Sequence, residues 1–517
     1  MDRAAVAKPV SLAPAAGLSN SMLLSLAALI VVAPVLAFAA YLRPPAMAPV
    51  AAAGIGAIAL FVTARAKTGS LLAARADWRA LAACLAAALL LCLLGGEDHV
   101  FFSPSDWFTR DSVLADLVRN GFPVFYRIDG QDYLLRAPLG MYLIPALIGR
   151  MSSLEAAHFA LLAQNATLFG IMFYLLSQAS EAPRARFLML LVLFSPVDIV
   201  PRLAADFTAW RETGAFVLNP LTNFWNPLFK YWGQIPSLFW ATNHALAGWF
   251  FGLLFLLHLR REIDDALLAL GFVALLFWSP LSMIGAAPFL ALRMAQTPLA
   301  RLLGGRNLAA AAIGLCFAPM AIYLSLDSGS ITHEWLIGKS GFWAWYLALL
   351  VFSIPQAWLV LGAWRDIPHW QRPAVALAIA LLMLAPFYRI GANEEYNDMA
   401  MRCTIVPLFV LGFAFCRVAP KIIAARGMLA FVCALVVTLS AVTGLLEIRR
   451  AIADPAYAIN DCNLLTSTAK IYPGFMPTNY LAAATAVPDW LLGRDGPRLE
   501  AERRVCWPGY SLLPAGS

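Results

Sequence analysis

Hydrophobic and polar residues are distributed along this chain in long alternating blocks. Apolar runs recur over its whole length, and many approach the roughly 17–25 residues that a helix needs to cross a bilayer. The sequence has no long period-two alternation typical of a barrel, so helices are expected to satisfy the backbone in lipid. The pattern predicts an all-α polytopic membrane protein with about thirteen transmembrane helices. Their expected ranges are 22–42, 47–63, 80–95, 154–176, 187–201, 237–258, 265–280, 281–293, 308–326, 342–363, 373–388, 403–416 and 427–446.

The positions of Lys and Arg indicate how these spans are oriented, because cytoplasmic loops are enriched in basic residues. With the N-terminus in the cytoplasm, the cytoplasmic loops hold Arg65, Lys67, Arg75, Arg79, Arg184, Arg186, Arg260, Arg261, Arg293, Arg301, Arg306, Arg365, Arg372, Arg417, Lys421 and Arg426. This orientation requires that residues 138–150, a short segment with two prolines, lie at the surface instead of crossing the membrane. It holds whether residues 265–293 form two spans or a re-entrant turn.

The long polar segments then share the outer face: 96–153, 202–236, 327–341, 389–402 and the tail from 447. We therefore expect a transmembrane domain over residues 1–446, whose first external loop (96–153) carries juxtamembrane helices. A small external region follows over residues 447–517. Cys462 and Cys506 lie in that region, where an oxidising compartment permits a disulfide. The first span is expected to remain as a signal anchor, because no small-residue cleavage site follows Leu42.

Composition narrows the class further. Of all residues, 61% are hydrophobic and only 13% are charged, and the formal net charge is +7. The basic residues lie mostly in short loops, and no basic stripe with interleaved aromatic residues occurs, so nucleic-acid binding is excluded as an interpretation. The cysteine and histidine spacings are not those of a zinc site.

The first external loop is unusually charged for so apolar a chain. Charged groups drawn towards a membrane core are costly and usually functional. Asp106 opens a helix with one apolar face, and Arg110 and Asp111 follow it. Asp106 is either an N-cap, a base that deprotonates an acceptor hydroxyl, or a ligand of a metal that bridges a phosphate. Arg110 is a candidate phosphate ligand.

Three further candidates lie at helix ends on the predicted outer face. Asp198 closes the predicted 187–201 span and is either a second site carboxylate or a solvated helix end. Asn243 and His244 fall in the first turn of the 237–258 span. They either contact a substrate hydroxyl or phosphate, or form structural hydrogen bonds. Because His244 has no second ligand at metal spacing, zinc is not predicted there.

Residues 389–402 hold the last candidates. Arg402 enters a span from outside, against the positive-inside tendency, and so requires a partner. It either forms an (i, i+4) salt bridge with Asp398 or binds the phosphate of a lipid donor, which its planar donors suit. Arg389 is a candidate to share that task. Glu394, Glu395 and Asp398 are candidate substrate or cation ligands.

Taken together, these features resemble the GT-C superfamily of integral-membrane glycosyltransferases, such as the protein O-mannosyltransferases and the lipid A aminoarabinose transferase. The matching features are the acidic residue Asp106 at the start of the first external helix, the Pro138-Leu139-x-x-Tyr142 segment, and the outward helix that ends at Asp198. They are scattered over roughly residues 80–420. Two features depart from the pattern: Trp107 stands where many members carry a second acidic residue, and two extra spans precede the loop.

The resemblance implies an enzyme of the bacterial inner membrane with a periplasmic active site. It would transfer a sugar from a polyprenyl-phosphate donor to a glycan, lipid or protein acceptor, with inversion. Asp106 and Asp111 compete for the role of base, and Asp106 is favoured. A divalent cation, Mg²⁺ or Mn²⁺, at Asp106 or Glu395 is a further expectation, since some members need one. The alternatives are a transporter or flippase of lipid-linked sugars and a non-catalytic assembly protein of the cell envelope.

Overall fold

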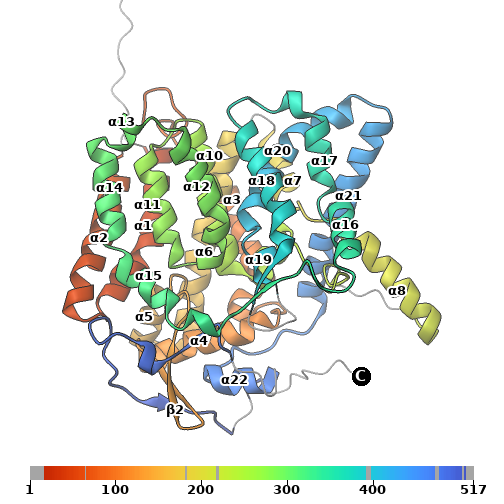
Figure 1. Cartoon of the computed structure of the whole chain (residues 1–517). Helices are drawn as coiled ribbons and strands as arrows, with labels where there is room; N and C mark the ends of the chain where they lie inside the picture. Colours follow the sequence, from red (N-terminus) through yellow and green to blue (C-terminus); the bar gives the residue numbers. More distant parts are fainter. Residues whose placement is uncertain are drawn as a thin grey trace, which may run out of the picture.

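The computed structural model describes residues 17–64, 66–180, 183–216, 221–391, 397–471, 477–503 and 506–507. Within them the chain is mostly helical, and most helices lie side by side in one bundle (Figure 1). Six helical segments are long and apolar enough to cross a membrane: α1 (Asn20–Ala39), α2 (Pro44–Val62), α6 (Leu154–Ala179), α10 (Thr242–Leu259), the α19–α20 segment (Asp398–Ala424) and α21 (Met428–Ala453).

Two further candidate spans are pairs of bent helices. Helices α14 (Gly305–Leu315) and α15 (Ala318–Ser325) meet at an angle of 41°, and α16 (Phe342–Phe352) and α17 (Pro355–Gly362) at 57°. In each pair a proline lies at the start of the second helix, where its missing N–H would interrupt a continuous helix. The described residues thus contain six to eight candidate spans, and the larger number of about thirteen stays a prediction.

The other helices are shorter than these candidate spans or belong to one of them: α3 (Trp78–Leu94), α4 (Asp106–Asn120), α5 (Leu143–Met151), α7 (Arg184–Val192), α8 (Ile199–Thr213), α9 (Gln234–Trp240), α11 (Asp265–Leu276), α12 (Pro280–Gln296), α13 (Leu299–Leu302), α18 (Arg372–Leu384), α19 (Asp398–Met401), α20 (Ile405–Ala424) and α22 (Leu464–Ile471). Helix α10 lies in the core of the bundle, where it packs against α6, α11, α12 and α20. Nearly all its residues are buried.

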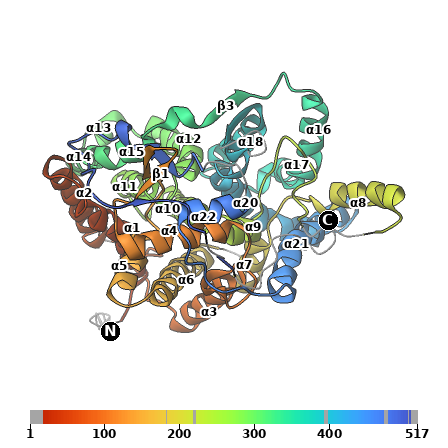
Figure 2. The same cartoon turned by 90° about the horizontal axis from the view of Figure 1, so that it is seen from below.

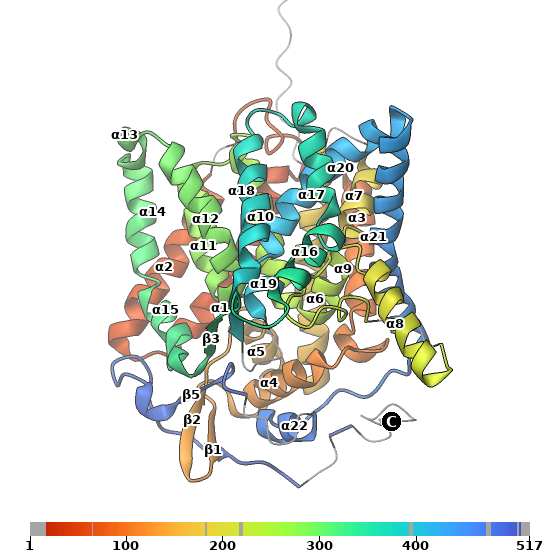
Figure 3. The ribbon, with the colours of Figure 1, turned by 45° about the vertical axis from the view of Figure 1, so that its right-hand side comes forward.

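The continuous helix expected over residues 187–201 is wrong. Helix α7 ends at Val192 and α8 begins at Ile199. Pro196 explains the break, because proline cannot donate a backbone hydrogen bond and disfavours helical geometry in the residue before it. Helix α8 then projects sideways from the bundle (Figures 1 and 3), with Leu203, Phe207 and Trp210 exposed.

The structure also places helix breaks within residues 237–258 and 265–293. The first range is divided at Ala241, which separates α9 from α10. The second forms two helices, α11 and α12, joined by a turn at residues 277–279. The side chain of Ser279 caps α12 by accepting a hydrogen bond from the backbone N–H of Ser282 at 3.0 Å. The predicted surface segment 138–150 contains the short helix α5, of nine residues.

A small sheet at one end of the bundle departs from the all-α expectation. Strands β1 (Phe125–Ile128) and β2 (Gln131–Leu135) form an antiparallel hairpin. Its turn residues Asp129 and Gly130 both have positive φ angles, of 48° and 77°, which is the geometry of a type I′ hairpin turn. Strands β5 (Leu481–Ala483) and β6 (Arg498–Leu499) extend the sheet in the order β5-β2-β1-β6. Strands β3 (Thr332–Trp335) and β4 (Tyr388–Gly391) form a separate pair.

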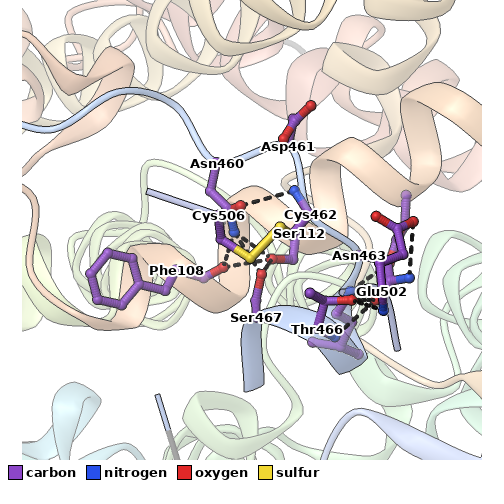
Figure 4. Close-up of a disulfide and its surroundings, with 12 residues drawn as sticks. Phe108, Ser112, Asn460, Asp461, Cys462, Asn463, Thr466, Ser467, Glu502 and Cys506 are labelled. Atoms are coloured by element: carbon purple, nitrogen blue, oxygen red, sulfur yellow. Dashed lines mark hydrogen bonds between the residues drawn. A yellow bond between two sulfur atoms is a disulfide. The ribbon is translucent and has the colours of Figure 1, made fainter. Parts of the chain in front are cut away.

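The C-terminal residues are therefore built into the structure of the segment 96–153. Helices α4 and α22 lie side by side at the lower end of the bundle, as the view from below shows (Figure 2). Cys462 and Cys506 form a disulfide next to this contact (Figure 4). Beside it, the buried Asn460 side chain donates hydrogen bonds to the Ser112 hydroxyl at 2.9 Å and the Ser467 hydroxyl at 2.6 Å.

Basic residues gather near α13, at the end of the bundle opposite the sheet (Figure 3). They line a cavity of about 850 Å³ together with acidic residues of the α10–α11 turn. Its basic lining residues are Lys67, Arg261, Arg293, Arg301 and Arg306. Arg293, Arg301 and Arg306 belong to α12, α13 and α14, and the other two lie outside helices. The charge pattern of the sequence predicts all five on one side of the membrane.

Candidate active site

Helix α4 begins the candidate site. Asp106 is its first residue, and the following Trp107 is fully buried and donates its indole N–H to the carbonyl of Gly95 at 2.8 Å. The Arg110 guanidinium lies over the Trp107 ring, 5.1 Å from its centroid. It contacts the Asp106 carboxylate at 3.4 Å and donates a hydrogen bond to the carbonyl of Trp240. The (i, i+4) spacing places Asp106 and Arg110 on one face of the helix.

A second acid–base pair lies at the entrance of α20. The short helix α19 is capped by Asn397, whose side chain accepts a hydrogen bond from the backbone N–H of Ala400 at 3.2 Å. One turn later, the Arg402 guanidinium donates a hydrogen bond to the carboxylate of Asp398. Both side chains are largely buried, with exposed fractions of 19% and 8%. The Asp398–Arg402 salt bridge, one of the two alternatives for Arg402, is therefore present in the structure.

The two pairs meet. The charge of Asp106 interacts electrostatically with both Asp398 and Arg402. Tyr480, from the C-terminal region, interacts with all four charged groups, and burial raises the pKa of its phenol. We call Asp106, Arg110, Asp398 and Arg402 the charged cluster. Of these, Asp106 retains an exposed fraction of 27%, so the cluster is open to an incoming group.

The charged cluster has unused hydrogen-bond donors. Nη1 of Arg110 and Nε of Arg402 are buried, and neither has a hydrogen-bond partner among the described residues. Buried polar groups in folded proteins are nearly always satisfied, and exceptions call for a functional explanation. An anion bound between the two guanidiniums would satisfy both donors.

An apolar groove runs beside Arg402. It has a volume of about 700 Å³ and lies between α12, α18 and the start of α20. Met399, three residues before Arg402, and Cys403, the residue after it, line the groove together with Thr404 and Pro407. At its wall Gly285 of α12 approaches the turn between α19 and α20 so closely that an added Cβ would lie 1.7 Å from the Cys403 carbonyl oxygen.

Histidine and asparagine at the start of α10 have structural partners. The His244 Nδ1 atom lies 2.6 Å from the hydroxyl of Ser279, and the Asn243 side chain donates to the carbonyl of Trp278 at 3.1 Å. His244 also interacts electrostatically with Arg110 and Arg402. It is therefore a neighbour of the charged cluster, whereas Asn243 joins α10 to the α11–α12 turn.

Two other candidates have partners outside the charged cluster. Asp198, 2% exposed, accepts hydrogen bonds from the Trp225 indole at 2.8 Å and the Ser353 hydroxyl at 3.1 Å. It is thus a buried acceptor between α7 and α8, not the solvated end of a continuous span. Arg389 donates a hydrogen bond to Glu334 across the β3–β4 pair.

Glu394 and Glu395 lie outside the described residues. This leaves Asp106 as the described position for the expected Mg²⁺ or Mn²⁺ ion. Those ions prefer several oxygen ligands, but the groups around Asp106 include the guanidiniums of Arg110 and Arg402. The one other carboxylate of the charged cluster is already paired with Arg402. The described surroundings of Asp106 therefore do not fit a divalent cation.

Asp111, the competing candidate for the base, lies with two histidines instead of in the charged cluster. Its Oδ2 atom is 2.9 Å from Nε2 of His99, and His158 is adjacent. Both histidines, and Tyr480, were missed by sequence reasoning. The residues of the histidine–aspartate group are separated by 12 and 47 positions in the chain, so no short sequence motif contains them.

The hairpin of the first loop did have a signal in the sequence. Asp129-Gly130 stands between apolar and aromatic runs, a combination typical of a two-residue hairpin turn. Recognising it would have predicted the β1–β2 hairpin, although not its pairing with β5 of the C-terminal region.

Comparisons with protein-family models, with curated proteins and with solved structures found no match to this chain. The functional argument therefore depends on the residues and the geometry described above.

Proposed function

We propose that this protein is a membrane glycosyltransferase that takes a sugar from a polyprenyl-phosphate donor. The observation that carries the proposal is the charged cluster beside the apolar groove. A polyprenyl phosphate needs both features, a cationic contact for its phosphate and an apolar surface for its chain. The groove of about 700 Å³ has room for the first isoprene units of such a lipid.

In this proposal the two acidic residues have different tasks. Asp106, the more exposed of the two, takes the proton from an acceptor hydroxyl. The hydroxyl oxygen then attacks the anomeric carbon, the bond from that carbon to the phosphate oxygen breaks, and polyprenyl phosphate leaves with the electron pair. The configuration of the sugar inverts. Asp398 is buried and orients Arg402.

The guanidiniums stabilise the leaving group. The free Nε of Arg402 and the free Nη1 of Arg110 are available to donate to phosphate oxygens as negative charge develops there. Because both groups are held by other residues before the donor arrives, little reorganisation accompanies the reaction. The basic loops at the other end support a cytoplasmic position for that end and a periplasmic position for the charged cluster.

The test separates binding from chemistry. The full chain is purified in detergent, and its binding of polyprenyl phosphate is measured by native mass spectrometry. Arg402→Gln is expected to weaken binding by about 10-fold or more, since a charge-assisted hydrogen bond is worth about 1.5–3 kcal/mol. Arg127→Gln removes one positive charge at the exposed sheet and is the matched control, with binding unchanged.

Asp106→Asn preserves shape and is expected to keep lipid binding, while transfer from a panel of polyprenyl-phosphate sugars falls by about 10²-fold or more. The proposal is overturned if Asp106→Asn and Arg402→Gln, both correctly folded, transfer sugar at the wild-type rate. Movement of the lipid across vesicle membranes without sugar transfer would identify a transporter instead. Binding of neither lipid nor sugar would favour an assembly role.

A further inference from the structure

The residues His99, Asp111 and His158 form a compact buried group outside the charged cluster. They come from three elements: the turn Glu97–His99, α4 and α6. One ligand atom from each lies within 4.8 Å of the others. The side chains are at most 8% exposed. Two imidazoles and a carboxylate are the ligand types of many transition-metal sites.

The hydrogen bonding of His99 favours a cation between it and Asp111. Nδ1 of His99 lies 3.2 Å from the backbone carbonyl of Tyr457, which can only accept, so this nitrogen carries a proton. In the neutral ring, Nε2 then has a lone pair, and it faces the Asp111 carboxylate at 2.9 Å. Two lone-pair atoms at that distance repel each other unless a proton or a metal ion lies between them. A ring N–H donated to a backbone carbonyl is also the usual second contact of a metal-bound histidine.

His158 distinguishes the metal from the proton. Both of its ring nitrogens are buried, and neither has a hydrogen-bond partner among the described residues. A proton shared between His99 and Asp111 satisfies that pair but leaves His158 without any partner. A metal ion accepts one lone pair from each of the three side chains, and so gives His158 a partner for one of its two ring nitrogens.

We propose that His99, Asp111 and His158 bind one divalent transition-metal ion, zinc being the commonest ion for two imidazoles and a carboxylate. Ligand atoms of tetrahedral zinc lie about 3.3 Å apart, so small side-chain rotations close the observed group around the ion. Three protein ligands leave one position for water or another small ligand. The site does not depend on the proposed transferase activity.

The ion would connect the first external loop to the bundle. Asp111 is the residue that follows Arg110 on α4, and His158 belongs to α6. Binding therefore fixes the helix that carries two members of the charged cluster. In this arrangement the metal has a positioning role, and no bond of the sugar donor is broken at it.

The first experiment measures metal content directly. The full chain is purified with an affinity tag free of histidine and without chelators, and its zinc is quantified by inductively coupled plasma mass spectrometry. About one zinc per chain is expected in the wild type, or after addition of one equivalent of zinc. His158→Gln is expected to contain less than a tenth of that amount. His258→Gln is the matched control, because His258 is also buried and lies 3.3 Å from an aspartate but belongs to no such three-residue group within the part of the chain that the structure describes.

A second measurement uses the wild type alone, so it tests the proposal even if His158→Gln does not fold. X-ray absorption spectroscopy of the zinc-loaded wild type is expected to show two imidazoles and oxygen ligands, without sulfur. The proposal is overturned if the wild type holds no zinc after loading, if the spectrum shows sulfur ligands, or if folded His158→Gln binds as much zinc as His258→Gln. Because none of these readouts uses sugar transfer, the metal site and the transferase can fail separately.

Discussion

The carboxyl group of Asp116 offers a quantitative test of how the C-terminal region docks on α4. Asp116 is 1% exposed, and its Oδ2 atom accepts hydrogen bonds from the Tyr126 hydroxyl at 2.7 Å and the Leu464 backbone N–H at 3.0 Å. It therefore joins α4 to the sheet and to α22. Burial raises the pKa of this carboxyl from 3.8 to about 7, although the two hydrogen bonds oppose the shift.

The sign of the effect on stability follows from this direction. Between pH 4 and 7 the folded protein keeps the Asp116 proton and the unfolded chain loses it, so stability falls as pH rises through this window. A shift of about three units corresponds to about 4 kcal/mol. Asp116→Asn cannot ionise, so it should lack this part of the decrease. At pH 4, Asp116→Ala should be less stable than Asp116→Asn by about 2–6 kcal/mol, because two buried donors lose their acceptor.

The assay is thermal unfolding of the detergent-purified chain, followed by tryptophan fluorescence at pH 4 to 8 and a fixed scan rate. The quantity compared is the difference in midpoint between variant and wild type. Asp489→Asn, at an exposed site in the same C-terminal region, is the control and should leave the pH dependence unchanged. The reasoning is refuted if Asp116→Asn shows the same pH dependence as the wild type, or if Asp116→Ala matches Asp116→Asn at pH 4.

Three further outcomes are expected from the same assay. Gly285→Ala should lower stability by about 2–3 kcal/mol, because its Cβ would clash with the Cys403 carbonyl oxygen and push α12 away from the turn that precedes α20; an unchanged midpoint contradicts this contact. Replacing Cys462 and Cys506 by serine should cost about 2–4 kcal/mol, and reductant should lower the midpoint of the wild type but not of the double variant. Burial raises the pKa of Glu97 from 4.5 to about 8, so wild-type stability should fall as pH rises through that window, and Glu97→Gln should show a flatter profile.

Hydropathy predicted the helical class and the apolar helices that are long enough to cross a membrane, because long apolar runs have few other structural solutions. Hydropathy was less accurate in locating the breaks within those apolar runs. The interruption after Val192 follows from Pro196, a local signal outweighed in the prediction by the apolar run around it. The start of α4 at Asp106 was predictable from local sequence, since helix starts depend on neighbouring residues.

The candidate site was predictable in its charges and not in its assembly. Asp106 and Arg402 stand out because charge is rare near apolar runs, and the structure places them within electrostatic reach. Tyr480 and His158 have no such signal. A tyrosine in a tail and a histidine in an apolar helix become notable only when tertiary packing brings them beside a charged partner.

Helix α4 shows why the hydrophobic pattern of the sequence did not reveal the contacts that its polar residues make. Successive residues of a helix are rotated by about 100°, so Asp106 with Arg110, then Asp111, then Ser112 with Asp116 point in three different directions. The structure uses each direction: towards the charged cluster, towards His99 and His158, and towards the C-terminal region. A sequence pattern with one apolar face predicts a helix half covered by solvent. Here the C-terminal region covers the remaining face, so the buried polar residues of α4 are connectors, and a change in one of them is expected to affect the position of the others.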